Sequence, residues 1–141
     1  MPINEEMIEA RIREINDAVQ ELRDLTTREF DELNVYQRLA MRYLVIQLVE
    51  AASSICIRIL MAAFNEKPEG FPECFLRLGK KGVLPRELAE RLASAAKLRN
   101  LLVHRYWTIR DKRVYESVRG GLGDFEEFVA YVRAFLVGAE G

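Results

Sequence analysis

The chain has 141 residues; half of them are hydrophobic, 30% are charged, and the formal net charge is −1. This composition is typical of a soluble globular protein and predicts one domain over residues 1–141 with a single hydrophobic core. It excludes a strongly basic protein, so any surface that binds nucleic acid has to be local. The two cysteines, Cys56 and Cys74, have no spacing typical of a metal site or a disulfide framework, which favours a reduced, cytoplasmic location.

The first half of the chain predicts two helices. Apolar residues recur at helical spacing over residues 3–24, and the acidic start of this segment is not typical of a signal peptide. No Gly or Pro interrupts the chain from Arg28 to about Phe64, which predicts one helix of roughly 36 residues. Thr26 or Thr27 is its expected N-cap.

This second helix is apolar around most of its circumference, which is typical of the central helix of a bundle. Four polar residues break its apolar run and argue against a membrane span: Arg42, Gln47, Glu50 and Arg58.

The second half of the chain predicts shorter helices. The stretch "FPECFLRLGKKG" reads as a short helix with a glycine C-cap, and the next helix starts at Pro85 and continues through "LLVHRY". "RDKRVYESV" predicts another short helix. A glycine-rich turn at 120–123 and an N-cap at Asp124 then precede the last helix. No stretch alternates with the period of a strand, so we expect an all-α, up-and-down helical bundle.

The segment "KLRNLLVHRYW" (residues 97–107) contains the only histidine and the only tryptophan of the chain. At about 100° per residue, Arg99 and Tyr106 fall on the apolar, core-facing stripe of this helix. Asn100 and His104 share a different face. A cation on an apolar stripe is costly unless it is paired, and Glu50 is the nearest candidate partner for Arg99.

Structural roles would also explain these residues. A single histidine near the end of a helix is often a surface residue that interacts with the helix dipole. Arg99 and Glu50 would then form a purely structural ion pair. Tyr106 and Trp107 would be core aromatics that close the bundle, although Trp107 would also suit stacking on a base.

The sequence resembles a known family at these same residues. "RNLLVHRY" fits the pattern R-x4-H-x-Y of HEPN-domain ribonucleases, carried here by Arg99, His104 and Tyr106. The text from "GVLPRELAERLASAAK" to "RVYESV", and the upstream "YLVIQLVEAASSI" with Glu50, is similar to the HepT branch of these proteins. The similarity extends from about Arg28 to Val137.

This resemblance implies a metal-independent endoribonuclease toxin that needs no cofactor. It implies a homodimer whose two motifs face a shared cleft, and a partner antitoxin of the MNT (MntA) nucleotidyltransferase type. The antitoxin of such a pair is expected to silence the toxin by transferring AMP to the motif tyrosine, here Tyr106. No membrane association is expected.

The chain departs from the family pattern at three positions. Arg105 occupies a position that is often Gly or an acid, Arg110 one that is often Asp, and Ser54 one that is an acid in many relatives. The two arginines make the surroundings of the motif more basic, which would favour binding of phosphate or mark a diverged member.

The residue types suit RNA cleavage in which the ribose 2′-OH attacks the neighbouring phosphorus. An imidazole titrates near neutral pH, so His104 is the candidate base. Arg99 is a permanent cation whose planar fork matches phosphate geometry, and Asn100 would orient His104 or the substrate. A tyrosine phenol is a poor base, so Tyr106 is expected to donate a hydrogen bond to phosphate.

One chain with one histidine cannot supply a His–His acid–base pair, whereas a homodimer brings two His104 side chains near its two-fold axis if the motif lies at the interface. Cations in the second half of the chain would add a basic cleft for RNA, or merely a mixed solvated surface. These cations are Lys80, Lys81, Arg86, Lys97, Arg105, Arg110, Lys112, Arg113 and Arg119.

The alternative function is a non-catalytic HEPN-like module that docks onto a nucleotidyltransferase. A purely structural bundle is the third hypothesis.

Overall fold

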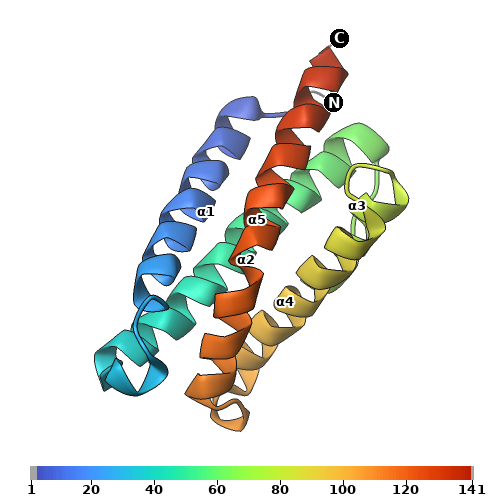
Figure 1. Cartoon of the computed structure of the whole chain (residues 1–141). Coiled ribbons are helices and arrows are strands. Elements are labelled where there is room, and N and C mark those ends of the chain that lie inside the picture. The colour runs from blue at the N-terminus through green and yellow to red at the C-terminus, as the bar shows by residue number, and fades with distance from the viewer. Residues whose placement is uncertain (1–2, 141) are drawn as a thin grey trace.

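The computed structural model describes the backbone of residues 3–140 and the side chains of residues 3–138. It is an all-α bundle, as predicted, with no strand among these residues (Figure 1). The helices are α1 (Glu5–Leu25), α2 (Val35–Phe64), α3 (Phe71–Lys80), α4 (Arg86–His104) and α5 (Asp111–Glu140). The start of α1 and the end of α5 lie at one end of the bundle, and the connection from α4 to α5 lies at the other.

Helix α2 is the central helix, because it contacts each of the other four helices. Twelve of its residues are buried, and one hydrophobic cluster joins it to apolar residues of all the others. By length and apolar composition α2 would also be able to cross a membrane. However, 61% of its most apolar window is buried inside the bundle, which is equally typical of a core helix.

The start of α2 was predicted too early, because the chain makes a 3-10 turn at Phe30–Glu32 before the helix begins at Val35. Thr26 is the C-cap of α1 rather than an N-cap, and its hydroxyl donates to the carbonyl of Leu22 at 2.9 Å. Asn34 is the N-cap of α2 and exchanges hydrogen bonds with Gln37, two residues that form a capping box.

Helix α5 is continuous from Asp111 to Glu140, so the predicted turn at 120–123 and the predicted N-cap at Asp124 are both wrong. Glycine lowers helix stability but does not break a helix whose apolar face is anchored on both sides. Val114 and Val118 are buried before the glycines, and Phe125 and Phe128 after them, so packing decides this segment rather than propensity.

Helices α3 and α4 form a close antiparallel pair joined by a tight turn. Gly82 has a φ of 78°, a backbone conformation that favours glycine. Gly79 lies in α3 where a Cβ atom would be 2.8 Å from the Cβ of Ala89, so the two helices approach closely only because this residue has no side chain.

We expect Gly79→Ala to lower the free energy of unfolding by about 1 to 2 kcal/mol, because the overpacking cost exceeds the gain in helix propensity. The matched control is Gly123→Ala in α5, where nothing lies within 4 Å of the added Cβ. This control is expected to raise the free energy of unfolding by about 1 kcal/mol. Urea unfolding of the two variants tests both signs, and equal effects would contradict the close approach at Gly79.

Candidate functional site

The guanidinium of Arg99, on α4, is held against α2 by the carboxylate of Glu50. The Nε and Nη2 groups of Arg99 donate to one oxygen of Glu50 at 3.2 and 2.5 Å. The Nη1 group donates to the side-chain oxygen of Asn100 at 2.9 Å, and the ring of Phe71 lies 4.6 Å below the guanidinium carbon. The Arg99 side chain is only 17% exposed, whereas that of Glu50 is 45% exposed. Arg99 therefore has a fixed orientation at the edge of the core.

His104 is the last residue of α4 and is exposed to solvent. It lies five residues after Arg99, which is about 7.5 Å along the helix axis and about 140° around it. Asn100 precedes His104 by one helical turn and is therefore on the same side of α4, and it also accepts the hydrogen bond from Arg99. The structure thus brings Arg99, Asn100 and Glu50 together, and places His104 one turn beyond Asn100 and on a different face of α4 from Arg99.

Tyr106 and Trp107 lie outside the helix and outside the core. Helix α4 ends at His104, and the chain turns at Arg105 into a short 3-10 turn, η2 (Tyr106–Thr108). Tyr106 is 61% exposed and Trp107 is 70% exposed, and their rings meet edge to face at 5.3 Å between centroids. The predictions that Tyr106 shares the core-facing stripe and that both rings close the core are therefore wrong, because the helix stops before reaching them.

Arg42 of α2 holds this turn in place and was missed as a site residue. Its Nε donates to the carboxylate of Asp111 at 2.5 Å, its Nη1 to the carbonyl of Tyr106 at 2.9 Å, and its Nη2 to the carbonyl of Ile109. The side chain of Arg42 is only 17% exposed. The sequence signal that could have identified Arg42 is its position in an apolar helix. A half-buried cation there needs acceptors from another element.

We expect Arg42→Met to release the turn that carries Tyr106. Losing charge-assisted bonds to one carboxylate and two carbonyls is expected to lower the free energy of unfolding by about 2 kcal/mol. It should also speed amide exchange over residues 105–111, which hydrogen exchange with mass spectrometry would detect. The control is Arg58→Met on the same helix, since Arg58 forms no ion pair among the described side chains. Unchanged exchange over 105–111 in Arg42→Met would contradict the role of Arg42.

A face of α2 next to this site is exposed and largely apolar. Tyr36 is 77% exposed, Leu39 59% and Tyr43 64%, and their spacing places them on one side of the helix. Farther along the same side, Tyr43 and Glu50 line one shallow cavity, and Glu50 and Ser54 line a second one that reaches Phe71. We call this side of α2, from Tyr36 to Ser54, the open face. Three large apolar side chains exposed on one side of a helix are typical of a surface that another protein covers.

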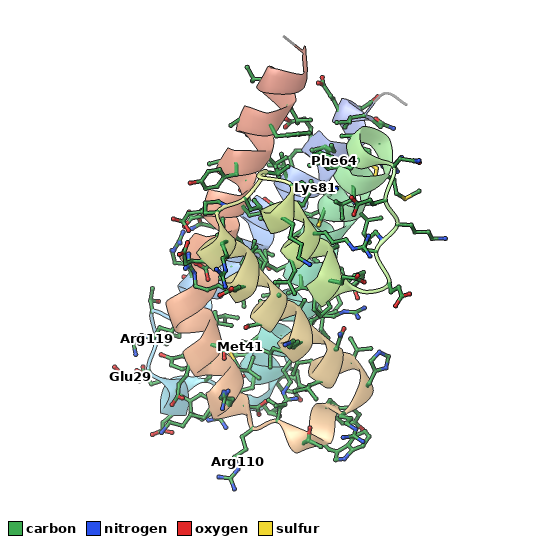
Figure 2. The ribbon with its side chains drawn as sticks, turned by 90° about the vertical axis from the view of Figure 1, so that its right-hand side faces the viewer. Glu29, Met41, Phe64, Lys81, Arg110 and Arg119 are labelled. Carbon is green, nitrogen blue, oxygen red and sulfur yellow. The ribbon has the colours of Figure 1, made fainter. Side chains whose placement is uncertain are left out.

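The predicted basic residues divide into paired and unpaired groups. Lys81 pairs with Glu66, and Arg86 pairs with Glu90. Arg105 and Arg110 are exposed, and neither forms an ion pair within the described part of the chain. Figure 2 shows Arg110 pointing away from the bundle at the end where α4 joins α5. The unpaired cations therefore include Arg105 and Arg110, which lie on either side of the turn η2.

Cys56 and Cys74 are free, buried thiols, and burial raises the pKa of Cys56 well above its usual range. No group of three His, Cys, Asp or Glu side chains in the described residues is arranged to hold a metal ion.

Comparison with known proteins gives consistent matches along the chain. Residues 8–132 match the family model described as ribonuclease HepT-like. The curated tRNA nuclease HepT of Aphanizomenon flos-aquae (strain 2012/KM1/D3) is 28% identical over 136 residues, which cover 95% of this chain and 92% of that protein.

Two solved structures have the same fold. One is a tri-AMPylated Shewanella oneidensis HEPN toxin in complex with an MNT antitoxin, with a TM-score of 0.83 at 20% identity, covering 91% of this chain and 97% of that one. The other is a cytosolic protein of unknown function from Bacillus subtilis, with a TM-score of 0.81 at 16% identity, covering 95% of this chain and 91% of that one.

Proposed function

Because the chain belongs to the ribonuclease HepT-like family, we propose that it is a metal-independent endoribonuclease toxin acting in the cytoplasm, with residues 1–141 as one domain. The observation that carries this proposal is the Arg99 guanidinium, which is fixed by Glu50 and Asn100 on the helix that ends at the exposed His104. The named activity of the curated relative makes tRNA the first substrate to test.

Arg99 is suited to bind the phosphate at the cleavage site. A guanidinium has five N–H donors, and the bonds to Glu50 and Asn100 use three of them. One N–H remains on each Nη nitrogen, and both are available to donate to phosphate oxygens. The same donors would stabilise the charge that builds on the phosphorane oxygens. In this account Glu50 and Asn100 are positioning residues.

His104 would take the proton of the ribose 2′-OH as that oxygen attacks phosphorus and the bond to the 5′-oxygen breaks. The products would be a 2′,3′-cyclic phosphate and a free 5′-hydroxyl, and the leaving oxygen needs a proton from a second group. Since the chain has one histidine, the His104 of a second copy is the candidate acid. Arg105 next to it, and Tyr106 as a hydrogen-bond donor, would contact the RNA backbone.

A homodimer through the open face of α2 would complete this site. Arg99 and His104 point about 140° apart on one helix, so a single chain does not bring them to one phosphate. Tyr36, Leu39 and Tyr43 lie on the open face, and Val103 is 39% exposed on α4 beside it. Burying this apolar surface against a second copy would place the two motifs across a two-fold axis.

We expect Leu39→Glu combined with Tyr43→Glu to dissociate the dimer, raising its dissociation constant by about 1,000-fold because two anchor side chains are replaced by charges. RNA cleavage should fall in parallel. The control is Val137→Glu, which changes an apolar residue of α5 that is at least as exposed as Leu39 and Tyr43. Sedimentation compares the oligomeric state of the wild type, the double variant and Val137→Glu. A wild-type monomer that cleaves RNA at full rate would refute the intersubunit site.

Tyr106 is the proposed target of an MNT-type nucleotidyltransferase antitoxin. Its ring is 61% exposed on a turn that Arg42 holds outside the bundle, so a second protein can reach the phenol oxygen. That oxygen would attack the α-phosphorus of ATP, forming a new P–O bond and releasing pyrophosphate, and the phenol proton would pass to the solvent or a base. AMP at this position would block the RNA path beside His104.

The function is tested by incubating purified protein with total tRNA in the presence of EDTA. The protein should first be checked by mass for AMP on Tyr106. Discrete fragments are expected. A folded, unmodified protein that leaves tRNA and other RNA classes intact would instead favour the non-catalytic docking module.

A further inference from the structure

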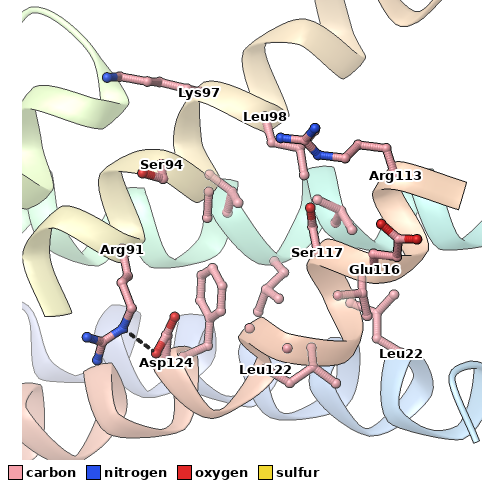
Figure 3. A pocket seen from close by; sticks show the side chains of 18 of the residues that line it. Leu22, Arg91, Ser94, Lys97, Leu98, Arg113, Glu116, Ser117, Leu122 and Asp124 are labelled. Carbon is pink, nitrogen blue, oxygen red and sulfur yellow. Dashed lines mark hydrogen bonds and ion pairs between the residues drawn. The ribbon is translucent and has the colours of Figure 1, made fainter. Parts of the chain in front are cut away.

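A cavity of about 520 Å³ lies between α4 and α5, on a different side of α4 from the Arg99–Glu50 pair. Its volume is within the range of small-molecule sites. Its floor is apolar and includes residues of the central helix and of α5: Val45, Leu48, Val49, Leu122 and Phe125. We call it the α4–α5 cavity (Figure 3). None of the residues that bind Arg99 lines it, so it is separate from the site described above.

Two cations without ion pairs stand at the rim of this cavity. Lys97 comes from α4 and Arg113 from α5; Figure 3 shows the Arg113 guanidinium extending over the cavity toward Leu98, with Ser117 below it, whereas the Lys97 side chain extends away from Arg113. Neither cation forms a salt bridge with any described side chain. At the opposite end Arg91 binds Asp124 at 2.9 Å, so that pair contributes no net charge. Glu116 is the one remaining acid, which leaves the rim with a net positive charge.

Two glycines keep the α5 wall of the cavity open. Gly120 and Gly121 line it, and a Cβ atom at either position would have nothing within 4 Å. Gly121 follows Arg113 and Ser117 at intervals of four residues, so all three lie on the same side of α5. Glycine inside a helix costs stability relative to any ordinary residue. At Gly120 and Gly121 this cost in helix stability leaves space unfilled beside the apolar floor of the cavity.

We propose that the α4–α5 cavity binds a small amphipathic anion, with an apolar body against the floor and one carboxylate, sulfonate or phosphate group at Arg113 and Ser117. The apolar lining supplies the driving force, the Arg113 guanidinium supplies charge-assisted hydrogen bonds that select an acidic head group, and Lys97 adds positive charge at the rim. The ligand would rest against Leu98 and Leu101, which flank Arg99 on α4. This inference stands whether or not the chain cleaves RNA.

Two probes with one aromatic body test the proposal in the full chain. 8-Anilinonaphthalene-1-sulfonate carries an acid, and N-phenyl-1-naphthylamine does not. We expect the sulfonate to saturate one site per chain and to bind about tenfold more tightly than the amine. Decanoate and 1-naphthoate, added as competitors, distinguish an acyl body from an aromatic one. Equal affinity of the two fluorescent probes would overturn the role of the cations.

Variants locate the site. Gly121→Leu should weaken both probes at least tenfold by filling the cavity, while Gly123→Leu, on the same helix but outside the lining, should bind as the wild type does. Lys97→Gln with Arg113→Gln should lower the affinity for the sulfonate about tenfold and leave the amine unchanged. Lys112→Gln is the control for charge. The Lys97→Gln with Arg113→Gln variant changes only side chains at the rim, so it tests the proposal even if Gly121→Leu folds poorly. Wild-type binding of the sulfonate by a folded Gly121→Leu protein would overturn the proposal.

Discussion

His104→Ala is expected to lower the rate of RNA cleavage by about 1,000-fold, within the range that a general base or acid contributes. In the proposed dimer the change removes both the base and the acid. His104 is exposed at the end of α4, and no hydrogen bond to the described residues depends on its ring, so the fold should be unaffected. The measurement is single-turnover cleavage of one tRNA with EDTA present.

A matched control for this variant is available on the same helix. Arg86 is 87% exposed at the other end of α4, and its ion pair with Glu90 contributes little at the surface. Arg86→Ala should therefore cleave at the wild-type rate. Equal activity of His104→Ala and the wild type would show that the imidazole takes no part in the reaction.

Arg99→Ala is expected to lower cleavage by about 100- to 1,000-fold, which is the usual effect of removing one group that stabilises developing charge. Arg99→Lys should restore little of this activity. An ammonium group has no planar fork, so it cannot bind Glu50 and Asn100 and still present two parallel donors to phosphate. The affinity for uncleaved RNA should change less than the rate does.

Glu50→Gln separates a positioning role from a purely structural one. The amide keeps the shape of the side chain but removes its charge, so Arg99 would be held less firmly. We expect a moderate loss of cleavage with little loss of affinity for RNA, and a stability close to that of the wild type because the carboxylate is 45% exposed. A large loss of stability in Glu50→Gln with normal cleavage would favour the structural ion pair.

The helical architecture was predictable because strong apolar periodicity over long segments leaves few alternatives. The pairing of Arg99 with Glu50 was also accessible from the sequence, since each is a charge in an otherwise apolar stretch. The helix boundaries were harder to predict from the sequence. The glycines at 120–123 favoured a turn by propensity, but packing on both sides keeps α5 continuous through them.

The turn after His104 needed the three-dimensional structure. Helical periodicity extended through Tyr106 and placed it toward the core, whereas the chain leaves the helix at Arg105. What fixes this exit is Arg42, which is distant in sequence and binds the carbonyl oxygen of Tyr106. The position of Arg42 in an apolar helix indicates that it needs acceptors from another element, but bonds to backbone carbonyls leave no signature in residue types, so the sequence does not indicate which element supplies them.

In the proposed reaction the ribose 2′-OH is the nucleophile, in a site built from Arg99 and His104. The direct test is cleavage of one RNA by the wild-type protein with EDTA, beside the same RNA carrying a single 2′-O-methyl group at the mapped cleavage position. We expect a 2′,3′-cyclic phosphate end on the unmodified RNA and no cleavage of the methylated one. Cleavage of both RNAs at the same position and rate would contradict it.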